Sequence, residues 1–143
     1  MTNKKFGWDS VGLDFGNWDD EKLWVLNVPT TKMDIAELLW HFSVPFWPND
    51  SGDRWTVTPW EAIHKEPGST HEQAKIKKAD LVYPIDILEN KGKWLVLDGL
   101  HRLAKSYLQH QEKVTVRKIP RTRLPEILID EPIELPGSVK DSL

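Results

Sequence analysis

The segment Trp-Leu-Val-Leu-Asp-Gly-Leu-His-Arg-Leu-Ala-Lys at residues 94–105 has the pattern of a strand, a tight turn and a helix start. Residues 94–97 are continuously apolar and have the length of a buried strand. Asp98 is a favourable N-cap, and Gly99 allows the close approach or unusual dihedral angles that such a turn needs. We therefore expect a helix that begins near Leu100, directly after the strand.

The first turn of this expected helix has the chemistry of an anion site. Its N–H groups have no partner inside the helix and lie at the positive end of the helix dipole. Arg102 offers a forked donor to anionic oxygens, and His101 can donate or shuttle a proton. A purely structural interpretation competes with this one: Asp98 is a cap, Arg102 pairs with a surface carboxylate and His101 is solvated.

The residues Asp98-Gly99-Leu100-His101-Arg102 resemble the DGxHR signature of the ParB/sulfiredoxin superfamily. Residues 83–87 and 114–120 resemble the strands that flank this signature, so the resemblance covers roughly residues 81–119. It implies a site for nucleotide phosphates, because the signature holds CTP in ParB proteins, ATP in sulfiredoxins and ADP in a related free-serine kinase.

Two departures from the family narrow its implications. Sulfiredoxins have their catalytic cysteine at the position of Leu100, and this chain contains no cysteine, so sulfiredoxin chemistry is excluded. ParB proteins continue into a helix-turn-helix domain, whereas only a short proline-containing segment follows the last expected strand here. We therefore do not expect sequence-specific DNA binding.

The rest of the pattern predicts an α+β fold, a small mixed sheet flanked by helices. The 143 residues suit one domain, with residues 1–20 as an irregular N-terminal segment and residues 121–143 as a C-terminal tail. Two capping boxes are expected, one at Thr58-Pro59-Trp60-Glu61 and one at Ser69-Thr70-His71-Glu72. The expected strands are 22–28, 83–88, 94–97 and 114–119, with a hairpin loop at 89–93, and the expected helices are 34–42, 59–65, 70–79 and 100–109.

Charge and hydropathy restrict the class of partner. The formal net charge of −3 argues against a general affinity for nucleic acids or anionic membranes. No apolar stretch reaches the roughly 20 residues of a membrane span, and the polar start does not suit a secretory signal, so we expect a cytoplasmic protein. Two basic clusters, usually solvated faces, are candidates for phosphate contact: Lys75, Lys77 and Lys78, and Arg117, Lys118, Arg121 and Arg123.

Other candidate ligand contacts lie outside the signature. Among eight tryptophans, Trp60 is the first candidate to stack on a nucleobase, although filling of the core is the more common role. His71 lies in the first turn of the expected helix 70–79, a second anion-binding helix end that would face His101. No histidine spacing is typical of a metal site. The carboxylates that could serve Mg²⁺ or act as a base are not distinguished by their spacing: Asp53, Glu61, Glu72 and Asp86.

Together with the anion site, the resemblance implies a nucleotide-phosphate-binding domain that acts as a phosphotransferase or a nucleotide hydrolase. ATP, ADP or CTP is the ligand that the resemblance implies, together with Mg²⁺ and an unidentified small-molecule or protein acceptor. His101 and Arg102 are the candidate catalytic residues. The alternative is a non-catalytic module that senses a nucleotide or binds a protein, and a nuclease is a third interpretation. The expected binding residues are Asp98, Gly99, Leu100, His101, Arg102, His71 and Trp60.

Overall fold

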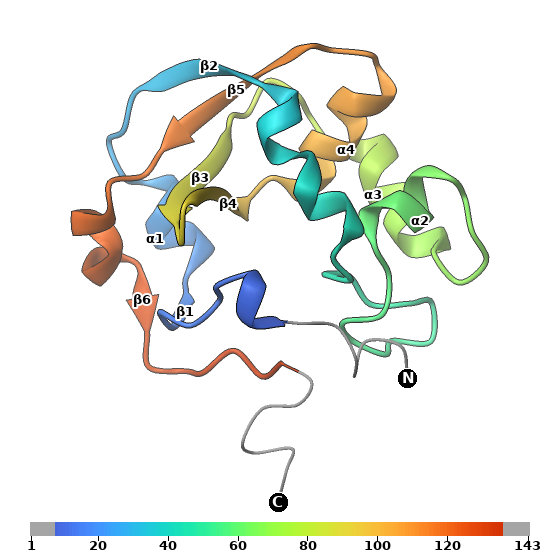
Figure 1. Ribbon diagram of the computed structural model, residues 1–143, viewed down its shortest axis with the longest axis horizontal. Helices are drawn as coiled ribbons and strands as arrows, with labels where there is room; N and C mark the ends of the chain where they lie inside the picture. Colours follow the sequence, from blue (N-terminus) through green and yellow to red (C-terminus); the bar gives the residue numbers. More distant parts are fainter. Residues whose placement is uncertain (1–7, 136–143) are drawn as a thin grey trace, which may run out of the picture.

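The centre of the molecule is a four-stranded mixed sheet with the strand order β2-β5-β3-β4 (Figure 1). The computed structural model describes residues 8–135, so the ends of the two expected terminal segments lie outside the described residues. The strands of the sheet are β2 (Thr30–Asp34), β3 (Ile85–Asn90), β4 (Lys93–Asp98) and β5 (Lys113–Lys118). Helices flank this sheet, so the predicted α+β class is confirmed.

A tight hairpin joins β3 to β4. Its turn consists of Lys91 and Gly92, both with positive φ (51° and 81°), which is the backbone that a two-residue hairpin turn requires. The connection is therefore shorter than the expected loop at 89–93. Helix α4 (Leu100–Leu108) then leads from β4 to β5, which pairs parallel with β3 and antiparallel with β2.

One face of the sheet is covered by α4 and three further helical segments: the 3-10 helix η3 (Ile35–Ser43), α2 (Pro59–Ile63) and α3 (Thr70–Lys78). Phe42 of η3 and Leu103 of α4 are fully buried in this core against Ile87 and Val116. The expected helix at 34–42 is thus present, but with 3-10 geometry.

A second core lies on the other face of the sheet. It is covered by α1 (Asp20–Trp24) and the 3-10 helices η2 (Trp8–Ser10) and η4 (Arg121–Glu126). A small antiparallel pair, β1 (Asn17–Trp18) and β6 (Leu128–Ile129), joins the two terminal segments. The segments expected to be irregular or a tail therefore contribute helical turns and a strand pair. Because both faces are covered, Ile87 enters the first core and its neighbour Leu88 the second.

The expected strand at residues 22–28 is wrong. The Asp19 carboxylate accepts hydrogen bonds from the N–H groups of Glu21 (2.8 Å) and Lys22 (3.2 Å) and so caps α1. Leu23 and Leu26 are buried at helical spacing, three residues apart, rather than at the alternate positions of a strand. The first strand of the sheet is β2.

Only the first of the two expected capping boxes forms. Thr58 Oγ1 accepts from Glu61 N–H (3.1 Å), and Glu61 Oε1 accepts from Thr58 N–H (2.7 Å). At α3 the N-cap residue Ser69 makes no such bond, because its hydroxyl donates to the Glu66 carbonyl. The second capping box is therefore wrong.

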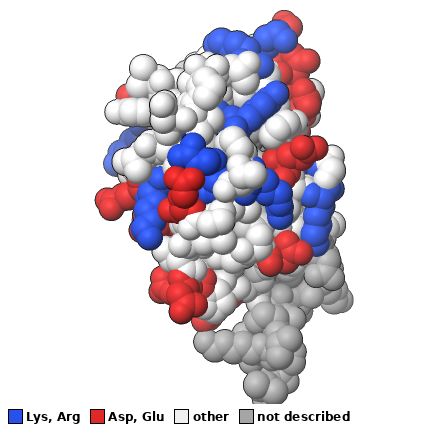
Figure 2. Space-filling view, turned by 90° about the vertical axis from the view of Figure 1, so that its left-hand side faces the viewer, with Lys and Arg blue, Asp and Glu red and all other residues white. Residues whose placement is uncertain are grey.

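Acidic and basic side chains are interspersed on the face shown in Figure 2, so this face is neither uniformly positive nor uniformly negative. This distribution agrees with the small net charge of −3. Across residues 8–135, every helix is too short or too polar to traverse a bilayer.

Candidate functional site

The turn after β4 depends on Gly99. This residue is the N-cap of α4 and has a φ of 111°, which glycine adopts without the strain that a side chain would bring. A Cβ here would lie 3.2 Å from Ile85 Cα and 2.9 Å from Arg102 Nη1. Asp98, expected as the N-cap, is not the cap, because its carboxylate bonds to side chains instead.

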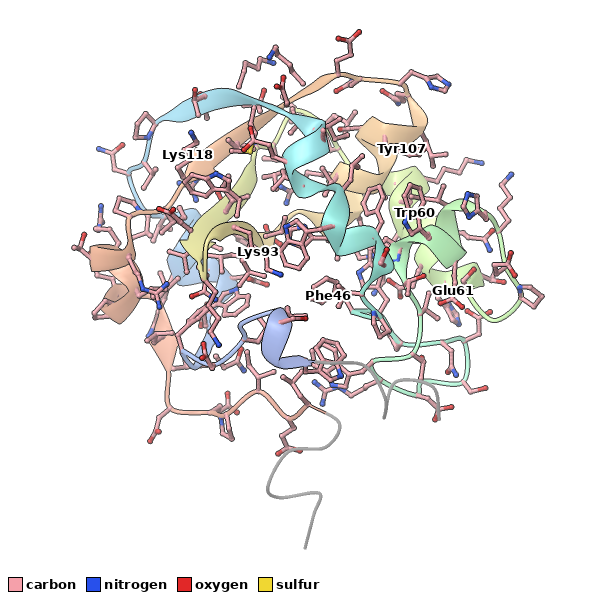
Figure 3. All side chains as sticks on the ribbon, viewed as in Figure 1. Phe46, Trp60, Glu61, Lys93, Tyr107 and Lys118 are labelled. Atoms are coloured by element: carbon pink, nitrogen blue, oxygen red, sulfur yellow. The ribbon has the colours of Figure 1, made fainter. Side chains whose placement is uncertain are left out.

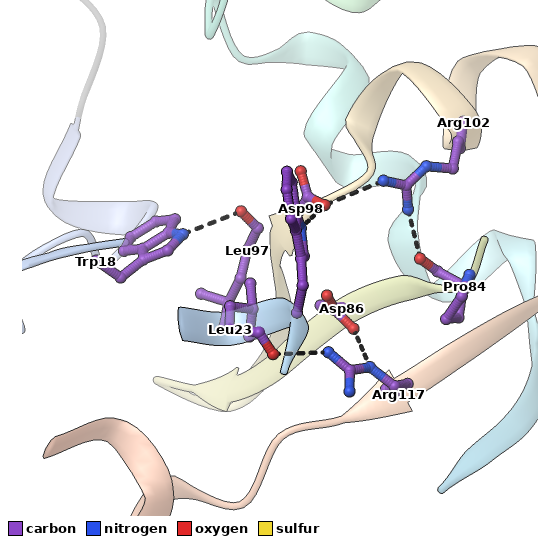
Figure 4. A network of polar contacts seen from close by, with 9 residues as sticks. Trp18, Leu23, Pro84, Asp86, Leu97, Asp98, Arg102 and Arg117 are labelled. Carbon is purple, nitrogen blue, oxygen red and sulfur yellow. Dashed lines mark hydrogen bonds and ion pairs between the residues drawn. The ribbon is translucent and has the colours of Figure 1, made fainter. Parts of the chain in front are cut away.

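Arg102 is held against the end of the sheet (Figure 4). Its Nη2 donates to Asp98 Oδ2 over 3.0 Å, and its Nη1 donates to the Pro84 carbonyl. Trp24 Nε1 also donates to Asp98 Oδ2, over 2.8 Å. The sequence predicts that Arg102 offers both terminal nitrogens to a ligand, but each of them already donates one hydrogen bond within the protein. The positive charge of Arg102 and its remaining N–H groups lie near the start of α4.

A second arginine extends this network across three strands. Arg117 on β5 is the register partner of Asp86 on β3, and Asp86 is the partner of Asp98 on β4. Arg117 Nε donates to Asp86 Oδ1 (2.6 Å), and its terminal nitrogens donate to the carbonyls of Leu26 (2.6 Å) and Leu23 (2.9 Å). Burial raises the pKa of Asp86, against the opposing effect of the Arg117 guanidinium. The β3–β4 register shifts directly after Asp86, a bulge of the kind that redirects side chains.

His101 forms a hydrogen bond with Glu72, a contact that the sequence pattern does not predict. His101 Nε2 lies 2.7 Å from Glu72 Oε1, and Glu72 is 1% exposed. The imidazole also stacks on Trp47, with ring centroids 4.3 Å apart and an interplanar angle of 5°. Burial lowers the pKa of His101, while its hydrogen bond to the Glu72 carboxylate opposes this shift. A buried carboxylate thus orients the ring, and Nδ1 has no hydrogen-bond partner among the described residues.

The N-terminus of α3 already holds an anion, the Asp50 side chain. Its two oxygens accept from Thr70 N–H (3.0 Å) and His71 N–H (2.9 Å), and these bonds lower the pKa of Asp50. The side chain of His71 is exposed. The expected second anion site at His71 is therefore wrong, and the residue that reaches His101 is the adjacent Glu72.

The N-terminus of α4 is open by contrast. The first N–H to bond within the helix is that of Leu103, which donates to the Gly99 carbonyl over 2.9 Å. The N–H groups of residues 100–102 have no acceptor within the described part of the chain. Leu100 supplies one of these donors while its side chain packs against the first core. Three unpaired donors therefore remain at the positive end of α4.

Two lysines of α3 lie beside this helix end. Lys75 and Lys78 line a cavity of about 290 Å³ at the motif, whereas Lys77 between them does not. Lys105 of α4 donates to the carbonyls of Lys77 (2.8 Å) and Ala79 (2.7 Å), which ties the end of α3 to α4. The remaining residues lining this cavity are Ala79, Asp98, Gly99, His101 and Arg102.

The side chains of the second basic cluster, at the end of β5 and in η4, form contacts within the protein. Arg117 is buried, and the Lys118 ammonium lies over the Trp94 ring, 5.0 Å from its centroid. Arg121 donates to Asn90 Oδ1 over 2.9 Å, and Arg123 pairs with Glu126. Lys75 and Lys78 of the first cluster thus border the motif on the α3 side, and Arg117 of the second borders it through a cavity of about 550 Å³ that it lines with Asp98 and Arg102.

The signature lies where three cavities meet. Asp98 lines the 290 Å³ cavity, a cavity of about 550 Å³ and one of about 630 Å³. Arg102 borders the first two, and His101 borders the first and the third. The five residues of the signature can thus contact a ligand that extends in more than one direction.

Trp60 is not part of this arrangement, contrary to expectation. It packs edge to face against Phe42 and Tyr107, with centroids 5.0 Å and 5.2 Å away, and stacks on His64. Figure 3 shows Trp60 beside Tyr107. It lines none of the three cavities at the signature. Trp60 closes the edge of the first core, because its large apolar ring is buried best there.

The four carboxylates that the sequence left undistinguished have separate roles. Asp53 accepts from Asn49, Glu61 completes the cap of α2, Glu72 binds His101 and Asp86 binds Arg117. Among residues 8–135, no group of three or more His, Asp or Glu side chains is arranged to hold a metal ion.

Comparison with known proteins does not assign a family. No protein-family model matches the chain, and no curated protein or solved structure is significantly similar to it.

Proposed function

We propose that this protein binds a nucleotide through its phosphates at the start of α4, as the resemblance to the ParB/sulfiredoxin signature implies. The observation that carries the proposal is the contrast between two helix ends. The chain fills the N-terminus of α3 with the Asp50 carboxylate, and it leaves the donors of residues 100–102 open. Helix N-termini of this kind attract phosphate groups.

The charges around the open helix end favour the same ligand. Lys75 and Lys78 line the cavity from α3, and Arg102 and the Gly99 turn line it from α4. Arg102 contributes charge and its unused N–H groups, because two of its nitrogens already bond to Asp98 and Pro84. Mg²⁺ that accompanies such a nucleotide would take most of its ligands from the phosphates and water.

Phosphoryl transfer or nucleotide hydrolysis is the reaction that the site supports best. His101, oriented by the buried Glu72, lines the 630 Å³ cavity and also the 290 Å³ cavity that we assign to the phosphates, the phosphate cavity. An acceptor hydroxyl or a water in the larger cavity would therefore lie within reach of the imidazole, which suits a general base. We place this activity in the cytoplasm, where nucleotides are abundant.

The direct test uses the exposed lysines, because substituting Arg102 would also break contacts inside the fold. We expect tripolyphosphate at about 100 times its dissociation constant to add roughly 2.7 kcal/mol of stability, which is roughly 5–10 °C in Tm. The Lys75→Ala/Lys78→Ala variant should lose on the order of tenfold in affinity per lysine. Lys77→Ala is the matched control and should bind as the wild type does.

Equal stabilisation of the wild type and the double variant would overturn the assignment of the phosphates to this cavity. ATP, ADP, CTP and GTP should be titrated in the same way, with and without Mg²⁺. A shift with none of these ligands would refute nucleotide binding.

The second candidate is a nucleotide sensor, and it is favoured by the Arg102–Asp98 pair, which a ligand could reorganise. Phosphate release that falls in the His101→Gln variant supports the enzyme. Saturable binding without release supports the sensor. Cleavage of DNA in the presence of Mg²⁺ or Mn²⁺ would instead support a nuclease.

A further inference from the structure

The 550 Å³ cavity beside the phosphate cavity has a different character. Its walls include Trp24 and Tyr83, whose side chains are 55% and 62% exposed, and its polar lining includes Asp86, Asp98, Arg102 and Arg117. It shares Asp98 and Arg102 with the phosphate cavity. The volume suits a small organic molecule, and exposed aromatic faces at the rim favour a flat one.

Asp86 and Asp98 line this cavity, and each has one carboxylate oxygen without a hydrogen-bond donor among the described residues. Asp86 bonds to Arg117 through Oδ1 only, and Asp98 receives both of its hydrogen bonds at Oδ2. Within the described residues, Asp86 Oδ2 and Asp98 Oδ1 therefore accept no hydrogen bond and remain available to a ligand. Because the two residues are register partners on β3 and β4, their side chains lie on the same face of the sheet.

The two arginines offer donors beside these acceptors. A guanidinium has five N–H groups. The bonds of Arg117 use three of them and those of Arg102 use two. The cavity thus combines unpaired acceptors, spare donors and aromatic walls, and its two acidic and two basic side chains give it no net charge.

We propose that this cavity holds the base of the nucleotide, and that the base is of the guanine class. The edge of guanine presents two adjacent N–H donors next to a carbonyl acceptor. The donors match the carboxylate oxygens, and the acceptor matches a spare guanidinium N–H. Adenine and cytosine would turn a ring-nitrogen lone pair toward a carboxylate, which is repulsive. Trp24 and Tyr83 pack against the ring in this arrangement.

This inference rests on the proposed phosphate site, and the two can be tested separately. Guanosine, which has no phosphate, probes the base cavity, and tripolyphosphate, which has no base, probes the start of α4. We expect calorimetric titration to show that guanosine binds more tightly than adenosine, cytidine or uridine. Inosine, which lacks the exocyclic amine, should bind more weakly than guanosine.

Substitutions of the exposed aromatic residues at the rim of the cavity test whether a base stacks there. Trp24→Ala and Tyr83→Ala should each weaken guanosine binding by on the order of tenfold or more, because each removes a stacking surface. Val25→Ala and Val82→Ala are matched controls, since these neighbours are still more exposed and do not line the cavity. Both controls should bind guanosine as the wild type does.

Absence of guanosine binding, or equal affinity for all four nucleosides, would overturn the base assignment. Tripolyphosphate binding that is retained in Trp24→Ala would then leave the phosphate site standing. Guanosine binding without tripolyphosphate binding would instead support the base cavity and refute the phosphate site.

Discussion

Arg117 is the residue whose removal should test the network beneath the site most strongly. Its side chain is 10% exposed and donates to Asp86, Leu23 and Leu26. The Arg117→Met variant keeps the aliphatic stem and removes all three bonds. Leaving one partner of a buried ion pair without its counter-charge costs about 3–5 kcal/mol. That is a large fraction of the roughly 5–15 kcal/mol by which a domain is stable.

The expected loss corresponds to a fall in Tm of about 6–20 °C for a protein of this size. Urea unfolding followed by tryptophan fluorescence gives the free energy directly. The exposed pair of Arg123 with Glu126 supplies the control, because Arg123→Met should leave the unfolding midpoint nearly unchanged.

A double variant and a pH series complete this test. Asp86→Leu/Arg117→Met should recover part of the loss, because it also removes the unpaired carboxylate. Burial already raises the pKa of Asp86, so the folded state binds its proton more tightly than the unfolded state does. The contribution of Asp86 to stability is therefore lost as the pH rises through the folded pKa, and Arg117→Met should steepen this loss. A destabilisation below about 1 kcal/mol at neutral pH would refute the reasoning, since it would mean that Asp86 and the two carbonyls are well solvated in the folded protein.

Two further substitutions address the signature itself. The Glu72→Gln variant removes the charge that opposes the lowering of the His101 pKa, so an NMR titration should show a lower midpoint for His101. An unchanged midpoint would mean that the His101–Glu72 pair does not form in solution. His41, whose pKa burial lowers to about 4, serves as the internal reference and should not move. Gly99→Ala should lower the Tm more than Gly92→Ala does, because both require a positive φ but only at Gly99 would the Cβ meet neighbouring atoms. Equal losses would show that the close approach to Ile85 is relaxed at little cost.

The elements around the signature could be read from the sequence because their signals are local. The apolar run at 94–97, the glycine at position 99 and the spacing of the following helix determine the strand, the turn and α4. The box at Thr58 and Glu61 is equally local, and it forms as expected. The strand predicted at 22–28 is absent, because its apolar alternation is short and the stronger local signal is the Asp19 cap of a helix.

The partners within the site could not be read in the same way. Glu72 and His101 are 29 positions apart, and Asp50 reaches α3 from 20 positions upstream of Thr70. Nothing local distinguishes a carboxylate that caps its own helix from one that bonds to another helix. The same limit applies to Arg102. Its charge suggests a direct contact with a ligand, but two of its N–H groups donate to Pro84 and Asp98, and the sequence does not predict the contact with Pro84.

The position of β5 in the sheet has a kinetic consequence. It lies between β2 and β3, yet it is the last of these strands in the chain, and its register pairs Thr30 with Arg117. Pairings between such distant segments are slow to form, because a long loop must close before they are stabilised. The β3–β4 hairpin and α4 can form early from local contacts, but Asp86 acquires its guanidinium only when β5 inserts. We therefore expect the cavity lined by Asp86 and Arg117 to be complete only after β5 has inserted between β2 and β3.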